Sequence, residues 1–180
     1  STEKQIIVRN SSIATITDND ILLVEDSDNN SIEIINENIG VGEYEFSLDD
    51  EFRIYKDASL FEKTTTGMHT LFVKDKNGCG ITPYQFSIFA FPKFFTPNGD
   101  GKNDVWKIDG FNIDSFTIAE ISIYNRFGVL LYQIESSFQS WDGTYQGKIL
   151  PSTTYWFRMI LNDVNGRKIE KTGSIGLIRK

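Results

Sequence analysis

The chain has 180 residues, room for one large domain or two small ones, and its 39% hydrophobic content supplies a core and argues against disorder. A net charge of −7 and an isoelectric point near 4.7 do not suggest a nucleic-acid-binding protein, and no apolar run approaches the roughly 18 residues that span a membrane. One cysteine and one histidine exclude an internal disulfide and the usual zinc sites, and residues 1–15 lack a signal-peptide pattern.

The two halves of the chain differ in charge. Residues 1–91 hold 16 acidic and 7 basic residues, a net charge of −9, whereas residues 92–180 hold 9 acidic and 11 basic residues, a net charge of +2. A change of this size predicts two domains with different surfaces. We place the junction at Phe91-Pro92, because proline holds the residue before it in extended geometry, which suits a short link between β domains.

Short strands separated by turns are predicted along the whole chain. In each clear run apolar side chains recur at every second position, the period of a half-buried β-strand, and no dozen residues keep a helical period. Asn-Gly pairs, the strongest short hairpin signal, stand at Asn77-Gly78 and Asn165-Gly166. The clearest alternating runs are Tyr44–Leu48, Thr70–Lys74, Ile121–Ile123 and Tyr155–Asn162.

A weak internal repeat relates the two halves. In both, a strand ends in Ile-Tyr, at Tyr55 and at Tyr124, and is followed by a threonine-rich turn, a long strand and an Asn-Gly hairpin. Chance similarity between β-rich stretches is the competing explanation. The repeat predicts that each half ends in a hairpin of its last two strands. The expected fold class is therefore all-β, with two tandem immunoglobulin-like β-sandwich domains at residues 1–91 and 92–180.

A loop near the start of the second half carries the most informative pattern. Asn98, Asp100, Asn103 and Asp104 place four oxygen-bearing side chains within seven residues, with glycines between them. Calcium is the ion that such spacing suits, with Asn98, Asp100, Asp104 and the backbone carbonyl of Lys102 as the candidate ligands. The pattern departs from the EF-hand, because Lys102 stands where a ligand is expected and no bidentate glutamate follows. The alternative is a turn held by Asx hydrogen bonds.

Three further turn motifs follow in the second half. Asn125–Gly128 comes directly after a predicted strand, and there Arg126 is expected to bond carboxylates or backbone carbonyls across the domain. Trp141–Lys148 combines a large anchoring aromatic residue with turn residues, and Pro151–Tyr155 opens the longest strand. Taken singly, these residues are also what the turns and core of a sandwich require.

Taken together, these motifs resemble the gliding-motility-associated C-terminal domain, the type B sorting domain of the type IX secretion system. The resemblance covers residues 92–180 and rests on four motifs in order: FFTPNGDGKNDVW, ISIYNRFGVLLY, WDGTYQGKILPSTTYWFRM and KTGSIGLIRK. In one departure, Thr153 stands where the family usually has glycine, and threonine tolerates positive φ poorly. The first half, through Gly42–Asp49 and Val73–Gly80, is similar to the last of the immunoglobulin-like repeats of large surface adhesins.

The resemblance implies a sorting function. The folded domain of a large cargo is recognised in the periplasm and at the outer membrane, and the cargo passes through the type IX translocon to the cell surface. Cargoes of this type rely on an outer-membrane partner of the PorP/SprF family. We therefore expect an exported, monomeric fragment of a longer protein, with residues 1–8 in either its first module or the preceding one. The residues that carry the sorting motif are Asn98, Asp100, Asn103, Asp104, Trp106, Asn125, Arg126, Gly128, Trp141, Asp142, Gly143, Pro151, Tyr155, Arg179 and Lys180.

The end of the chain is basic. Residues 158–180 hold six basic residues against two acidic ones, which suits steering toward an acidic partner surface. The last strand, Ile175–Arg179, is a candidate for pairing with an open strand of the partner. A solvated edge with protective charges is the competing explanation.

Two other classes of function compete with a sorting role. A calcium-stabilised adhesion module without a sorting role also suits the acidic first half and the oxygen-rich loop. An enzyme is not expected, because His69 is the only histidine available for Ser-His-Asp chemistry. His69 falls in a predicted turn, where an exposed position is expected.

Overall fold

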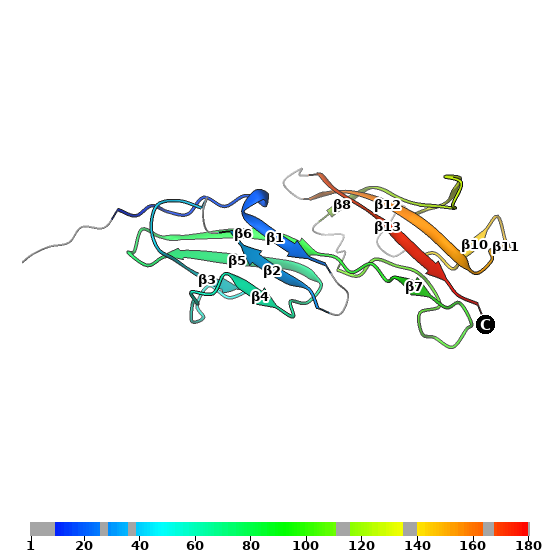
Figure 1. Ribbon diagram of the computed structural model, residues 1–180, viewed down its shortest axis with the longest axis horizontal. Coiled ribbons are helices and arrows are strands. Elements are labelled where there is room, and N and C mark those ends of the chain that lie inside the picture. Colours follow the sequence, from blue (N-terminus) through cyan, green and yellow to red (C-terminus); the bar gives the residue numbers. More distant parts are fainter. Residues whose placement is uncertain are drawn as a thin grey trace, which may run out of the picture. The chain divides into compact units, whose positions relative to one another are not determined.

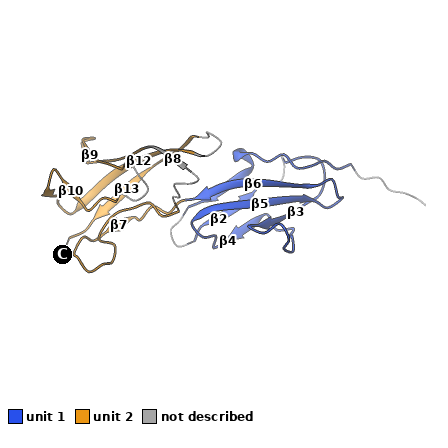
Figure 2. Ribbon diagram, turned by 180° about the vertical axis from the view of Figure 1, so that it is seen from behind, with its two compact units in different colours: residues 1–88 blue, residues 89–180 orange. Residues whose placement is uncertain are grey.

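The structure, a computed structural model, describes residues 10–25, 29–35, 39–110, 116–134, 140–163 and 168–179 (Figure 1). The chain divides into two compact units, residues 1–88 and 89–180, so the division lies close to the predicted Phe91-Pro92 junction (Figure 2). Strands make up both units, and the described residues include a single 3-10 turn, Asp18–Asp20. No helix in the described residues has the length and hydrophobicity to cross a membrane.

The first unit contains two antiparallel sheets of three strands each, with strand orders β1-β2-β4 and β3-β5-β6. Apolar side chains from both sheets form one core, in which Ile32, Phe46 and Leu71 have almost no exposed surface. The strands are β1 (Ile21–Val24), β2 (Ser31–Ile34), β3 (Tyr44–Leu48), β4 (Leu60–Glu62), β5 (Gly67–Asp75) and β6 (Ile81–Ile88).

Strands β5 and β6 confirm the hairpin predicted at Asn77-Gly78. They pair antiparallel, and Gly78, with a φ of 89°, donates its N–H to the Asp75 carbonyl across the turn. The predicted exposure of His69 is wrong. β5 already begins at Gly67, and its alternation turns His69 inward, so only 5% of that side chain is exposed.

The second unit contains a five-stranded sheet with the order β7-β13-β12-β8-β9 and a two-stranded ribbon of β10 and β11. Strand β7 runs parallel to β13, and the other pairs are antiparallel. The strands are β7 (Phe94–Phe95), β8 (Phe116–Tyr124), β9 (Leu130–Ile134), β10 (Thr144–Tyr145), β11 (Lys148–Ile149), β12 (Thr153–Asp163) and β13 (Lys168–Leu177).

Strand β12 confirms the predicted alternation of the longest run. Tyr155, Phe157, Met159 and Leu161 are buried, whereas Trp156 on the opposite face is 42% exposed. Strands β12 and β13 pair along most of their length, as expected for a final hairpin. The Asn165-Gly166 turn predicted between them lies outside the described residues.

The prediction that the last strand, Ile175–Arg179, pairs with an open strand of a partner is wrong. Strand β13 lies inside the sheet, between β12 and β7, with Gly176 opposite Phe94 and Leu177 opposite Phe95. Just beyond it, Ile178 donates its N–H to the Phe95 carbonyl over 3.0 Å. The backbone groups that a partner strand would need are therefore already paired within the unit.

The sheets of the two units confirm the predicted all-β, immunoglobulin-like sandwich class. In the second unit the Tyr155 hydroxyl donates to the Pro151 carbonyl over 2.9 Å, a bond of the same kind as the tyrosine corner of immunoglobulin domains. Thr153, the residue that departs from the family glycine, begins β12 opposite Leu177 in ordinary strand geometry. The threonine therefore introduces no strained turn.

Candidate functional site

The oxygen-rich loop of the second unit is organised around the carboxylate of Asp104. Its two oxygens accept hydrogen bonds from the backbone N–H groups of Asn98, Gly99 and Gly101 at 2.7–2.9 Å. These bonds, with those from Gly99 and Gly101 contributing most, lower the pKa of Asp104. Gly99 and Gly101 have φ values of 79° and 80°, so glycine provides the left-handed backbone that aims their amides at one carboxylate.

The other oxygen-bearing side chains of this loop bond within it. Asp100 accepts the Lys102 N–H at 2.7 Å and the Asn98 side-chain amide N–H at 2.9 Å, and the side-chain oxygen of Asn98 accepts the Asp100 N–H at 3.0 Å. This is the hydrogen-bonding pattern of consecutive Asx turns. Among the described residues, no three His, Cys, Asp or Glu side chains gather as around a metal ion. Carboxylate oxygens retain further lone pairs, so calcium binding by this loop stays a prediction.

Two tryptophans of the sorting motif are core residues. Trp106 and Trp141 have no exposed surface, and their backbones exchange two hydrogen bonds, of 2.8 and 2.9 Å. The indole N–H of Trp106 donates to the Pro92 carbonyl at 2.9 Å, and that of Trp141 donates to the Thr144 carbonyl at 3.0 Å. Both rings therefore tie loops to the sheet, and neither is accessible to a partner in the folded unit.

Arg179 connects motifs that are far apart in the sequence. Its guanidinium lies 3.0 Å from the carbonyl oxygen of Gly143 and 3.1 Å from that of Leu150. Longer contacts of 3.4 Å reach the carbonyl oxygens of Pro97 and Asp142. The oxygen-rich loop, the tryptophan turn and the segment before β12 therefore meet around one side chain. Because a carbonyl oxygen only accepts and a guanidinium only donates, arginine is well suited to this position.

Gly143 is packed against the same arginine. A Cβ atom at this position would lie 2.5 Å from the Leu177 side chain, 3.0 Å from a terminal nitrogen of Arg179 and 3.2 Å from the Phe95 ring. The φ of Gly143 is 78°, a conformation that other residues rarely adopt. Two constraints, space and backbone geometry, therefore both require glycine in this turn. Its neighbour Asp142 holds the turn by accepting the Thr144 N–H and hydroxyl.

The turn between β8 and β9 projects its side chains outward. The side-chain oxygen of Asn125 accepts the N–H groups of Phe127 and Val129, and Gly128 adopts a φ of 76°. Phe127 is 75% exposed, and the Arg126 guanidinium lies 4.8 Å from the centre of its ring. The expected bonds from Arg126 to carboxylates or carbonyls across the domain are not present in the described residues, so that prediction is wrong. A short tight turn directs this side chain outward instead.

A groove of about 400 Å³ lies beside this turn. It brings together two of the sorting-motif islands, because its lining includes Arg126 and Phe127 from the β8–β9 turn and Pro151 and Tyr155 from the start of β12. The lining of the groove is mixed and includes the cation of Arg126 and the aromatic ring of Phe127. The sequence analysis predicted Arg126 as a site residue but did not include Phe127. An aromatic residue in a tight turn, where no strand buries it, is a sequence signal that could have indicated this exposed position.

The basic end of the chain is partly neutralised within the unit. Arg158 contacts Glu170 at 2.8 Å, and Lys168 contacts the same carboxylate at 3.2 Å, which lowers the pKa of Glu170. The cations that remain for steering a partner are therefore fewer than the sequence count suggested. Lys180, the last predicted motif residue, lies outside the described residues.

Comparison with known proteins identifies a relative for the second unit. The family model described as the CHU_C type IX secretion signal domain matches residues 89–177. That family is one of secretion signals and not a catalytic family. No curated protein matches the chain.

Two solved structures are distantly similar to this chain. Dimeric latent PorU from Porphyromonas gingivalis aligns over 95% of this chain and 19% of its own, with 14% identity and a TM-score of 0.38. The SGBP-B of the Bacteroides ovatus mixed-linkage glucan utilization locus, in complex with a mixed-linkage heptasaccharide, aligns over 87% of this chain and 44% of its own, with 13% identity and a TM-score of 0.28. This chain thus spans less than half the length of either protein.

Proposed function

Because residues 89–177 belong to the family of CHU_C type IX secretion signal domains, we propose that this unit directs a large cargo through the type IX translocon as a folded signal. A type IX secretion signal implies interaction with that machinery and export to the cell surface or beyond. The finer proposal is that an outer-membrane protein of the PorP/SprF family reads the folded surface during periplasmic transit. No enzymatic activity is proposed for the chain itself.

The convergence of the motif islands around Arg179 carries this proposal. Four separate backbone carbonyls meet one guanidinium, and the tryptophans of the motif are inside the core. Such residues are accessible to a partner in an unfolded chain only, and there they have no defined arrangement. Most of the motif therefore builds the shape of the signal, and a few exposed residues are left to contact the partner.

The groove beside the β8–β9 turn is our proposed contact. Arg126 has no acidic partner among the described residues, and Phe127 exposes most of its ring. Arginine and aromatic residues are enriched where interfaces derive most of their binding energy. A partner segment with an acidic and an apolar side chain complements this pair.

Export of a reporter tests the proposal. The whole chain, fused to a secreted reporter with its own inner-membrane signal, is expected to bring the reporter to the cell surface. Arg126→Ala and Phe127→Ala should each reduce surface delivery at least about tenfold while leaving the melting temperature nearly unchanged. Lys148→Ala and Ile149→Ala are matched controls, because both side chains are exposed on the β10–β11 ribbon outside the groove.

Other results separate the competing functions. If the wild-type fusion folds but stays inside the cell, the sorting proposal is wrong and the calcium-stabilised adhesion module becomes the better account. If the groove variants are exported like the wild type, the sorting proposal stands and the groove assignment fails. Capture of a PorP/SprF-type barrel from outer-membrane extract by the wild-type chain, and not by Arg126→Ala, tests the partner directly.

A further inference from the structure

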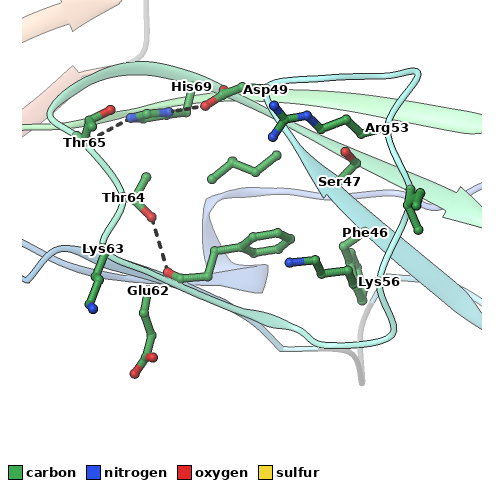
Figure 3. A pocket seen from close by; sticks show the side chains of 13 residues that line it. Phe46, Ser47, Asp49, Arg53, Lys56, Glu62, Lys63, Thr64, Thr65 and His69 are labelled. Carbon is green, nitrogen blue, oxygen red and sulfur yellow. Dashed lines mark hydrogen bonds and ion pairs between the residues drawn. The ribbon is translucent and has the colours of Figure 1, made fainter.

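The first unit has a cavity of about 350 Å³ that the sorting function does not use (Figure 3). Its walls come from β3 and the loop after it, and from β4 and the start of β5. The size falls at the lower end of the range for small-molecule sites, about 300–1,000 Å³. A single amino-acid residue or sugar unit is therefore the scale of ligand that fits.

The acidic groups at this cavity are engaged or turned away. One oxygen of Asp49 lies 2.7 Å from His69 Nδ1, and the other accepts the Thr70 N–H at 2.8 Å. The second ring nitrogen of His69 contacts the Thr65 carbonyl at 2.8 Å, which closes this wall. Figure 3 shows Glu62 directed away from the middle of the cavity. No acidic side chain of the wall is thus directed at an incoming ligand.

Two cationic side chains, those of Arg53 and Lys56, extend from the loop after β3 toward this cavity. The backbone of Lys56 exchanges two hydrogen bonds of 2.8 Å with Phe46, which fixes where its side chain starts. Its ammonium has no acidic partner among the described residues. The Nε of Arg53 lies 3.3 Å from a carboxylate oxygen of Asp50. The two terminal guanidinium nitrogens of Arg53 are therefore available to bind a ligand. Positive charge therefore faces the cavity, in a half of the chain whose net charge is −9.

The other residues that line the cavity favour an anion with an apolar body over a sugar acid. Phe46, Leu48 and Phe61 give the cavity apolar walls. The hydroxyl groups of Ser47 and Thr64 already donate to backbone carbonyls, at 2.6 and 3.3 Å. A sugar acid would bring several hydroxyl groups into a site with few free partners, and unpaired polar groups are costly to bury. An anion with an apolar body avoids that cost.

We propose that this cavity binds a carboxylate with an apolar body, of the kind presented by the carboxyl-terminal residue of a peptide. The carboxylate accepts charge-assisted hydrogen bonds from Lys56 and Arg53, and the apolar side chain lies against Phe46 and Phe61. The first unit then acts as a binding module, independent of the secretion signal.

Titration of the whole chain with N-acetyl-L-leucine, followed by amide NMR shifts, tests this site. Saturable shifts are expected around residues 46–56 and 61–69, and N-acetyl-L-leucinamide, which has the same shape without the charge, should bind at least about tenfold more weakly. D-galacturonate, a sugar acid, should also bind more weakly. Lys56→Met and Arg53→Gln should each weaken binding of the carboxylate about tenfold.

Lys63→Met is the matched control, because Lys63 belongs to the same rim but points away from the cavity in Figure 3. It should bind like the wild type. Absence of saturable binding by the folded wild-type chain would overturn the proposal, as would equal binding of the amide or unchanged affinity in both cation variants. Tighter binding of galacturonate would overturn the choice of an apolar body.

Discussion

Replacing Arg179 tests whether the convergence of motifs stabilises the second unit. Arg179→Met keeps the aliphatic stem and the backbone bond from the Arg179 N–H to the Ser152 hydroxyl, but removes every guanidinium contact. Two of those contacts, to Gly143 and Leu150, have good geometry at 3.0 and 3.1 Å, whereas the other two are 3.4 Å long. The two short bonds are therefore expected to contribute most of the stabilisation.

Hydrogen bonds to a charged donor contribute roughly 1.5–3 kcal/mol each, and partial exposure of Arg179 reduces that value. We therefore expect Arg179→Met to lower the free energy of unfolding of the second unit by about 2–3 kcal/mol. For a unit of this size, a loss of that order lowers the melting temperature by roughly 8–25 °C. The carbonyl of Leu150, left without the Arg179 donor, contributes to the cost, whereas the Gly143 carbonyl keeps its hydrogen bond from the Leu150 N–H at 3.1 Å.

Tryptophan fluorescence during urea unfolding measures this effect in the right unit. All three tryptophans, Trp106, Trp141 and Trp156, lie in the second unit, so their emission follows its unfolding alone. Arg126→Met is the control, since its guanidinium contacts only the Phe127 ring among the described residues and should cost at most about 1 kcal/mol. Equal urea midpoints for Arg179→Met and the wild type would refute the reasoning.

Three further predictions concern the same unit. Gly143→Ala should destabilise it by about 2 kcal/mol or more, since a Cβ lies 2.5 Å from Leu177 and the φ is positive; thermal unfolding measures this, and an unchanged melting temperature would contradict it. The folded-state pKa of Asp104 is lowered, so its stabilisation is complete above the unfolded-state pKa of about 3.9 and is lost as the pH falls. Asp104→Asn should therefore lower stability at pH 7 and flatten its acid dependence, and parallel stability–pH curves would count against this account. Calcium at 1 mM should raise the melting temperature over that in EDTA, and Asp100→Asn should reduce the shift; identical melts would remove the calcium prediction.

Local features of the fold could be predicted from the sequence because they depend on local rules. Alternation of apolar and polar residues places Tyr155 and Met159 on one buried face of β12, and a strand shows this period wherever it lies in a sheet. Asn77-Gly78 predicts its hairpin for a similar reason, since the turn depends on a few adjacent residues. The order of the four motifs was sufficient to suggest the family of the second unit.

Tertiary structure decided which groups remain free to act. Spacing along the chain does not show that β7 covers the end of β13, nor that Arg179 reaches the carbonyl of a residue 82 positions earlier. The sequence pattern also predicted a turn at His69, because no residue near His69 marks where β5 begins. Alternation specifies which side of a strand is buried, but strand order and long-range contacts depend on pairings between distant segments. Those pairings left Arg126 and Phe127 at the surface and turned the tryptophans of the motif into core residues.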